Sequence, residues 1–271
     1  MKKLTLTFLI ILFTLTSNVV WSADFNKGWD AFESEDYTTA LREWIPLAED
    51  GDVDAQYHLA WMYTEGQGVP QNHKAAVKWF TLAAEQGDVD SQYNLAQLYS
   101  EGQGVPQDYE AAVKWYTLAA EQGLSNAQYN LAFMYEEGQG VPQDYKAAVK
   151  WHTLAAEQGL SNAQYNLGYI YANGFGVPQD YKKAVKWLRL AVEQGQPHAQ
   201  FLLGQMYFMG FGVAQDYKTA TELFSAAASQ GFTLAQHNLA RMYFDGLGVE
   251  KDYKAAVDWW TQAAEAGMKE A

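Results

Sequence analysis

Residues Asp88–Gly123 read DVDSQYNLAQLYSEGQGVPQDYEAAVKWYTLAAEQG, and the following segment, Leu124–Gly159, nearly repeats them. The two segments are identical at 27 of their 36 positions. One glycine keeps the same spacing all along the chain, from Gly51 to Gly267. Such a fixed period is typical of a solenoid, in which each unit buries its apolar face only against its neighbours. The sequence therefore predicts a solenoid with a 36-residue period.

Each repeated unit contains two stretches with helical spacing of apolar residues. In the first unit one stripe runs from Ala55 to Tyr63 and the other from Ala76 to Ala84. The segment Gly66-Gln67-Gly68-Val69-Pro70 separates them, and its glycines and proline stop either helix from crossing it. An Asn or Asp at the start of each second helix suits an N-cap, and a glycine suits the end of that helix. We therefore expect helix–loop–helix hairpins, which make an all-α fold of the α/α solenoid class.

The period also predicts how the chain is divided. We expect six repeats, at residues 52–87, 88–123, 124–159, 160–195, 196–231 and 232–267. Residues 24–51 keep the register but lack the Gly-x-Gly loop, so they read as a divergent capping helix pair, with residues 268–271 as a carboxy-terminal tail. No further repeat covers the last helix, which carries Trp259 and Trp260. We expect this end either to fray or to associate with another copy or a partner.

The amino terminus has the pattern of a secretory signal peptide. The chain begins MKK, and the run from residue 4 to residue 20 is largely apolar and uncharged. Cleavage after Ser22 or Ala23 is expected, and we take residues 1–23 as the signal peptide. We expect the mature protein to be periplasmic or secreted, and not an integral membrane protein. An uncleaved membrane anchor is the alternative. The chain has no cysteine, which excludes a lipoprotein anchor and disulfides.

The charge balance narrows the class of partner. The chain has 18 basic and 32 acidic residues, a net charge of −14 at pH 7. Nucleic acid is excluded, because phosphate binding depends on a basic surface that this chain lacks. The acidic surface would attract basic partners or divalent cations. Alternatively, the negative charge only keeps the protein soluble.

The unit A-Q-Y-x-L-A-x-x-Y-x-x-G-x-G-V-P-Q-D-Y-x-x-A-V-K-W resembles the Sel-1-like repeat, a relative of the tetratricopeptide repeat. The resemblance covers residues 52–267, with residues 24–51 as a partial copy. It implies a right-handed α/α superhelix that serves as an adaptor for protein–protein or protein–glycan assembly. Exported bacterial members are associated with envelope assembly, host interaction and signalling. Some cysteine-rich members bind or weakly hydrolyse penicillin, but those carry a disulfide in each repeat.

We find no set of residues that predicts catalysis, a cofactor or a metal. Catalysis needs a nucleophile, a base or metal ligands that converge at one place. His198 and His237 fall on neighbouring first helices, but two imidazoles without a third ligand make a poor zinc site. The Gly-x-Gly loops lack the preceding strand and the Lys-Ser/Thr ending of a phosphate loop. We therefore expect a protein that is not an enzyme; a hydrolase of β-lactams or cell-wall amides is the alternative.

The candidate partner-binding surface is the non-core face of the first helices, which line the inner curve in related tetratricopeptide arrays. Its first half is acidic and aromatic, and its second half is apolar. Clustered exposed apolar residues often mark partner sites. The candidate residues are Tyr57, Trp61, Glu65, Tyr93, Glu101, Tyr129, Phe133, Glu137, Tyr165, Tyr169, Phe201, Phe208, Met209, Phe211, Arg241 and Phe244.

Two alternatives remain open for this surface. The tyrosine that recurs once per repeat belongs to the repeat pattern, so it suits a structural role as well as a binding role. Several apolar residues of the second half would also fit as packing between loops. We expect an exported, non-catalytic scaffold that binds protein partners in the bacterial cell envelope, with an envelope glycan- or peptidoglycan-binding module as the alternative.

Overall fold

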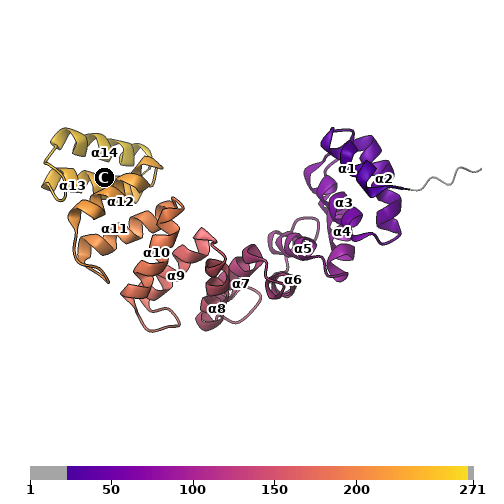
Figure 1. The fold of residues 1–271 in the computed structure, drawn as a ribbon, viewed down its shortest axis with the longest axis horizontal. Helices are drawn as coiled ribbons and strands as arrows, with labels where there is room; N and C mark the ends of the chain where they lie inside the picture. Colours follow the sequence, from indigo (N-terminus) through magenta and orange to yellow (C-terminus); the bar gives the residue numbers. More distant parts are fainter. Residues whose placement is uncertain (1–22, 268–271) are drawn as a thin grey trace, which may run out of the picture.

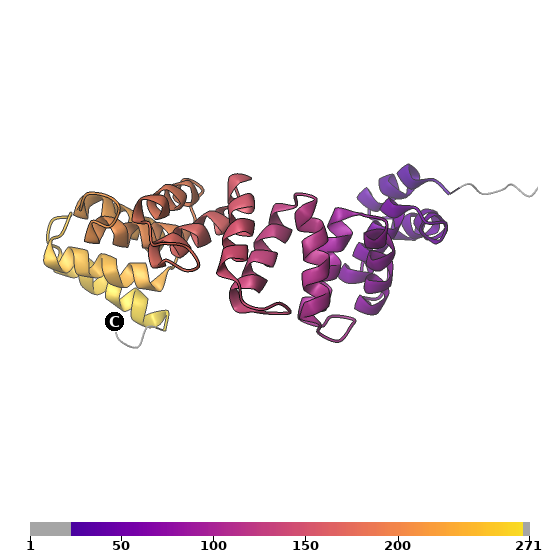
Figure 2. The same cartoon turned by 90° about the horizontal axis from the view of Figure 1, so that it is seen from below.

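The computed structural model describes residues 23–267, and within these residues it contains fourteen α-helices and no strand. Consecutive helices form antiparallel pairs that follow one another along an arc, with the first pair and the last pair at opposite ends (Figure 1). Seen from below, the pairs stand side by side in one elongated row (Figure 2). The predicted α/α solenoid is therefore confirmed. The expected signal peptide, apart from Ala23, and the tail lie outside the described residues.

The helices keep an almost constant length along the chain. The capping pair is α1 (Phe25–Glu33) and α2 (Tyr37–Glu49). The first helices of the six repeats are α3 (Val53–Glu65), α5 (Val89–Glu101), α7 (Ser125–Glu137), α9 (Ser161–Asn173), α11 (Pro197–Met209) and α13 (Thr233–Asp245). The second helices are α4 (His73–Glu85), α6 (Tyr109–Glu121), α8 (Tyr145–Glu157), α10 (Tyr181–Glu193), α12 (Tyr217–Ser229) and α14 (Tyr253–Glu265).

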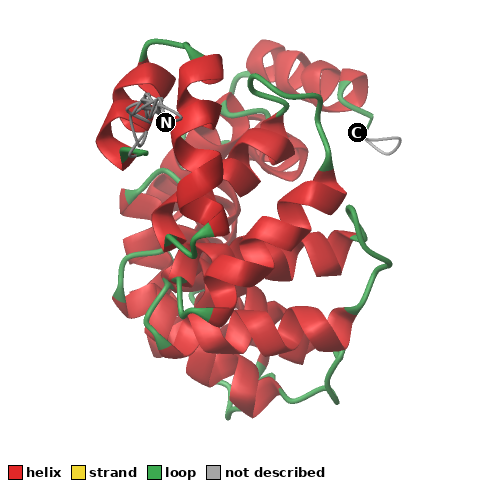
Figure 3. Ribbon diagram, turned by 90° about the vertical axis from the view of Figure 1, so that its right-hand side faces the viewer, coloured by secondary structure: helices red, strands yellow, loops and turns green. Residues whose placement is uncertain are grey.

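The helices end where the sequence predicts. The carboxylate of Asp108 accepts a hydrogen bond from the Ala111 amide at 3.0 Å, which satisfies one of the free amides of the first turn of α6. Asn72 and the other aspartates at this position cap their helices in the same way. Gly102 adopts a left-handed conformation at the end of α5. Only the loop segments between helices are irregular (Figure 3).

The core is a continuous stack of small and large side chains. Ala55, Ala83 and Ala119 are completely buried, like their equivalents in other repeats. Small side chains at these positions let neighbouring helices approach closely, and large ones such as Phe80 and Phe224 fill the remaining space. The helices are thus held by contacts between consecutive pairs; α9 and α11, two first helices, also contact each other directly.

Paired glutamines connect each repeat to the one before it. The Gln158 amide donates to the side-chain oxygen of Gln128 at 2.8 Å and to the Gly123 carbonyl at 3.0 Å. Gln128 in turn donates to the Ala120 carbonyl at 3.1 Å. The same three bonds are present at Gln86–Gln56, Gln122–Gln92 and Gln194–Gln164. At Gln230–Gln200 the two bonds donated by Gln230 are present. These pairs form a hydrogen-bonded row across the repeat interfaces, which we call the glutamine row.

The glutamine row stops at the last repeat. Ala266 stands where the earlier repeats have glutamine. The side-chain oxygen of Gln236 is consequently buried without a hydrogen-bond partner among the described residues. A buried unpaired acceptor is costly, because it has lost water without gaining a protein partner.

The second glycine of each loop packs against the preceding repeat. A Cβ atom on Gly140 would lie 2.3 Å from the Tyr109 carbonyl oxygen, at the start of the preceding second helix. Gly104, Gly212 and Gly248 have the same close backbone contact. The Gly-x-Gly segment is therefore more than a hairpin connection, because it also sets how closely two repeats approach.

We expect Gly140→Ala to destabilise the protein far more than Gly123→Ala. Both glycines have positive φ angles, of 69° and 98°, so each alanine costs about 1–2 kcal/mol of backbone strain. No atom lies within 4 Å of a Cβ built on Gly123; Gly140→Ala adds a backbone clash. Urea unfolding followed by circular dichroism measures both. Equal losses would mean that the contact with Tyr109 does not set the spacing of the repeats.

We expect Gln158→Ala to cost about 1–3 kcal/mol, because it leaves the buried Gln128 oxygen unpaired. Ala266→Gln should gain about 1 kcal/mol by giving Gln236 the partner that other repeats have. Hydrogen exchange of the amides in the affected repeats reports each change locally. Glu265→Gln, an exposed neighbour outside the glutamine row, is the matched control. A gain with Glu265→Gln equal to that with Ala266→Gln would contradict this account.

Candidate functional site

The first helices present one variable residue per repeat on the predicted inner face. The position is occupied by Trp61, Gln97, Phe133, Tyr169, Gln205 and Arg241. Trp61, Phe133 and Tyr169 are exposed to 39%, 43% and 44%. Since these large side chains are incompletely buried, the core does not determine them.

The recurring tyrosines lie deeper, in a half-buried row. Tyr57 packs on Phe80, Tyr93 on Tyr116, and Tyr129 on His152, with ring centroids 5.5–6.0 Å apart. Burial raises the pKa of these tyrosines and of Tyr165, so the hydroxyls stay protonated at neutral pH. The row joins first to second helices, which supports the structural role for these rings.

Acidic residues follow the same face in the first three repeats. Glu65, Glu101 and Glu137 end α3, α5 and α7 and are exposed. The equivalent residues of the next two repeats are Asn173 and Met209, which carry no charge. The position is therefore acidic in α3, α5 and α7, neutral in α9 and α11, and acidic again at Asp245, which ends α13.

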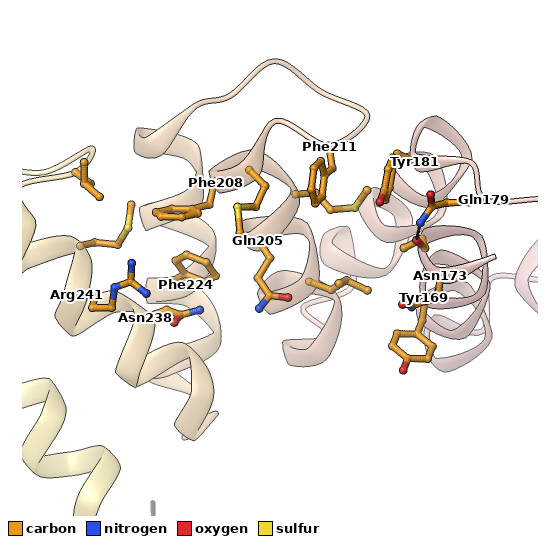
Figure 4. Close-up of a pocket in the computed structure, with 16 residues that line it drawn as sticks. Tyr169, Asn173, Gln179, Tyr181, Gln205, Phe208, Phe211, Phe224, Asn238 and Arg241 are labelled. Atoms are coloured by element: carbon orange, nitrogen blue, oxygen red, sulfur yellow. Dashed lines mark hydrogen bonds between the residues drawn. The ribbon is translucent and has the colours of Figure 1, made fainter. Parts of the chain in front are cut away.

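A cleft opens in the second half of the array, across the three successive first helices α9, α11 and α13. Its volume is about 490 Å³. We call it the α9–α13 cleft, and Figure 4 shows its lining residues. Its lining residues are Tyr169, Ala172, Asn173, Gln179, Tyr181, Leu202, Gln205, Met206, Phe208, Met209, Phe211, Phe224, Asn238, Arg241, Met242 and Leu247.

Five of the candidate residues predicted from sequence meet in this cleft. They are Tyr169, Phe208, Met209, Phe211 and Arg241. The remaining candidates lie elsewhere. Phe201 is half-buried between Phe224 and Phe232, and Phe244 is exposed but contacts Tyr253 and Trp260 at the end of the array. Whether any candidate binds a partner stays a prediction.

The loop residue Phe211 combines packing with exposure. Its ring stacks on Tyr181 of α10, with centroids 4.8 Å apart and planes 12° apart. It is nevertheless 44% exposed. Phe211 therefore packs on a neighbouring helix and lines the cleft as well, so the packing interpretation and the binding interpretation both remain open for this ring.

Asn238 is a cleft residue that the sequence analysis missed. Its equivalents Asn130 and Asn166 reach polar rings of the preceding repeat, Tyr116 and His152. In the last repeat the ring at that place is Phe224, which accepts no such bond. A comparison between repeats of this asparagine together with its ring partner on the preceding second helix, rather than of each position alone, would have indicated that Asn238 lacks the polar ring.

The described residues hold no group of three or more His, Cys, Asp or Glu side chains placed to bind a metal. His198 contacts the rings of Tyr165 and Phe232, and His237 lies near Trp260. The two histidines are thus engaged with aromatic neighbours. Among the described residues no helix is long and apolar enough to cross a membrane.

The last helix exposes positions that other repeats bury. Val257 is 58% exposed and Tyr253 is 59% exposed, whereas Val113, the equivalent of Val257, is 9% exposed. These residues form an uncovered apolar face on α14. Self-association through this end stays a prediction.

The family model for the Sel1 repeat matches residues 53–88, 89–124, 125–160, 161–196, 197–232 and 233–268. The chain belongs to the Sel1 repeat family. The matched Sel1 repeats begin one residue after the repeats predicted here. Sel1 repeat proteins typically mediate protein–protein interactions, and the family is generally non-catalytic.

Two solved structures resemble this Sel1 repeat protein closely. A protective antigen present in uropathogenic Escherichia coli strains is 38% identical, with a TM-score of 0.85, over 89% of this chain and 52% of that one. A Sel1 repeat protein from Oxalobacter formigenes is 35% identical, with a TM-score of 0.76, over 90% of this chain and 72% of that one. The present chain thus spans about half the length of the first relative. A search of curated proteins found no match.

We expect Phe211→Ala to cost no more than about 1 kcal/mol, the order of one aromatic stacking contact. Phe224→Ala should cost about 3–5 kcal/mol, because it empties a buried core position. Urea unfolding of both variants provides the comparison. If Phe211→Ala is as destabilising as Phe224→Ala, the loop-packing interpretation holds and Phe211 is not available to a partner.

Proposed function

We propose that this protein is an exported, non-catalytic adaptor of the bacterial cell envelope that binds a segment of a partner protein in the α9–α13 cleft. The convergence of Tyr169, Phe208, Met209, Phe211 and Arg241 on that cleft carries the proposal. Export rests on the signal-peptide pattern of residues 1–23.

The chemistry of the cleft supports a peptide segment as its occupant. Phe208, Phe211 and Tyr181 offer large apolar surface, which dominates many protein interfaces. Met209 is 58% exposed, and methionine side chains adapt to differently shaped partners because they are flexible and polarizable. The arc also presents the first helices in a row, so an extended segment could continue from the cleft onto the acidic face of α3, α5 and α7.

A glycan-binding function is the second candidate. Aromatic rings beside carboxamides, such as Tyr169 beside Asn173 and Gln179, occur together in the cleft. Saccharides can pack on rings and hydrogen-bond to amides. Yet the amides of Asn173 and Gln179 already donate to the Tyr169 and Ala172 carbonyls, so the cleft favours the peptide.

The test is affinity capture from an envelope extract of the source organism. The mature protein is compared with a cleft variant, Phe208→Ala, Met209→Ala and Phe211→Ala combined. We expect a protein that the mature form retains and the cleft variant loses, because the cleft supplies the apolar contacts. The matched control, Trp61→Ala with Phe133→Ala, removes exposed aromatic surface from the same face outside the cleft. Circular dichroism confirms equal helicity first.

Equal capture by mature protein and cleft variant would contradict the proposed site. Loss of the partner with the Trp61 and Phe133 control alone would move the site to the acidic half of the face. Capture of peptidoglycan fragments, and of no protein, would favour the glycan-binding function instead.

A further inference from the structure

The α9–α13 cleft contains a single charged residue. Among its lining side chains only Arg241 is ionic, and none is a carboxylate. This is unusual for a chain with 32 acidic and 18 basic residues. The residues equivalent to Arg241 in the other repeats are Trp61, Gln97, Phe133, Tyr169 and Gln205. The repeat pattern therefore does not require a cation at this position.

Three polar side chains of the cleft have unused hydrogen-bonding groups. In the part of the chain that the structure describes, Arg241 has no ion pair, and neither it nor Gln205 nor Asn238 makes a side-chain hydrogen bond. Arg241 and Asn238 are three residues apart on α13, which places them on one face of the helix. Figure 4 shows these two beside Phe224, with Gln205 opposite them on α11. All three provide donors.

We infer that Arg241, Asn238 and Gln205 form a carboxylate-binding subsite, and that the cleft takes an extended peptide segment carrying one carboxylate among apolar side chains. The inference rests on the proposed function, because it names the chemistry of the segment that the cleft takes. The guanidinium matches a carboxylate in shape and charge, and the carboxamides can donate to the carboxylate as well. The rings of Phe208, Phe211 and Tyr181 then receive the neighbouring apolar side chains.

The charge of the subsite selects a carboxylate over a phosphate. One guanidinium balances one negative charge, whereas a phosphorylated side chain carries about −1.5 to −2 at pH 7. Among the lining residues Arg241 is the only cation. The exposed carboxylate of Asp245 lies one turn after Arg241 on α13, and the acidic residues Glu101 and Glu137 lie along the same face towards the amino terminus. The single positive charge of Arg241 would therefore neutralise only part of the charge of a bound phosphate dianion, whereas it neutralises the charge of one carboxylate.

The probe for the test is a displayed library of random heptapeptides, selected on the mature protein. We expect enriched peptides to carry one Asp or Glu beside aromatic or aliphatic residues. The best peptide is then synthesised with its carboxylate and, as a pair, with Asn or Gln in its place. We expect the acidic form to bind the mature protein about tenfold more tightly, the order expected for a charge-assisted hydrogen bond.

Arg241→Gln should remove that tenfold preference and leave the affinity for the neutral peptide nearly unchanged. Arg241→Glu should reverse the preference towards peptides with Lys or Arg. The matched control is Lys254→Gln, which removes one positive charge from an exposed position of the same repeat. It should keep the tenfold preference. Arg241 is exposed, so these variants should fold like the parent, which circular dichroism checks.

The outcomes separate this inference from the proposed function. If enriched peptides bind the cleft and are lost with the Phe208, Met209 and Phe211 variant, but show no carboxylate preference, the subsite is wrong and the adaptor site stands. A carboxylate preference that survives Arg241→Gln also overturns the subsite. If no peptide is enriched, peptide binding is overturned, and envelope capture still decides the adaptor function. If the enriched peptides bind the cleft variant as tightly as they bind the mature protein, both the carboxylate-binding subsite and the proposed binding site in the α9–α13 cleft are overturned.

Discussion

The close approach of consecutive repeats is the constraint on which this structure depends. Completely buried alanines such as Ala83 and Ala119 allow neighbouring helices to touch, and the second loop glycine packs against the backbone of the repeat before it. Because each unit buries its apolar face only against its neighbours, any side chain added at these contacts would change the spacing of the array. That spacing decides which residues of successive first helices lie beside one another.

The hydrogen bonds of the glutamine row fix the register of this apolar contact. Apolar packing is tolerant of small shifts, whereas buried amides such as Gln128 and Gln158 need their partners in defined places. At five successive interfaces the second glutamine of the pair also donates to the carbonyl of the glycine that ends the preceding unit. The register of the array is thus fixed by polar groups inside an alanine-rich contact. In the last repeat the Gln236 amide still donates to the Ala228 carbonyl at 3.3 Å, but the second glutamine is absent, and the buried side-chain oxygen of Gln236 has no partner among the described residues.

A regular scaffold makes its irregular positions informative. Tyr169, Gln205 and Arg241 occupy the same position in successive repeats. The residue at this position varies in size and charge because it projects from the first helix and is not fully buried. When three such residues come from adjacent repeats they line one surface. In this protein the cleft formed there is apolar with one cation, while the first half of the same face is acidic, so a partner segment meets different chemistry along the array.

The sequence by itself determined the repeat, the helix pairs and their ends, because glycine, proline and capping residues act locally and recur with a fixed period. It also indicated Phe208, Met209 and Phe211 as an apolar group, of which Met209 and Phe211 are exposed and Phe208 is half-buried against Tyr217. Only the tertiary structure decided that these meet Arg241 and Asn238 in one cleft, and that Phe201 is half-buried instead. Those outcomes depend on the spacing between repeats, which arises from contacts between residues about one period apart and is invisible to local patterns.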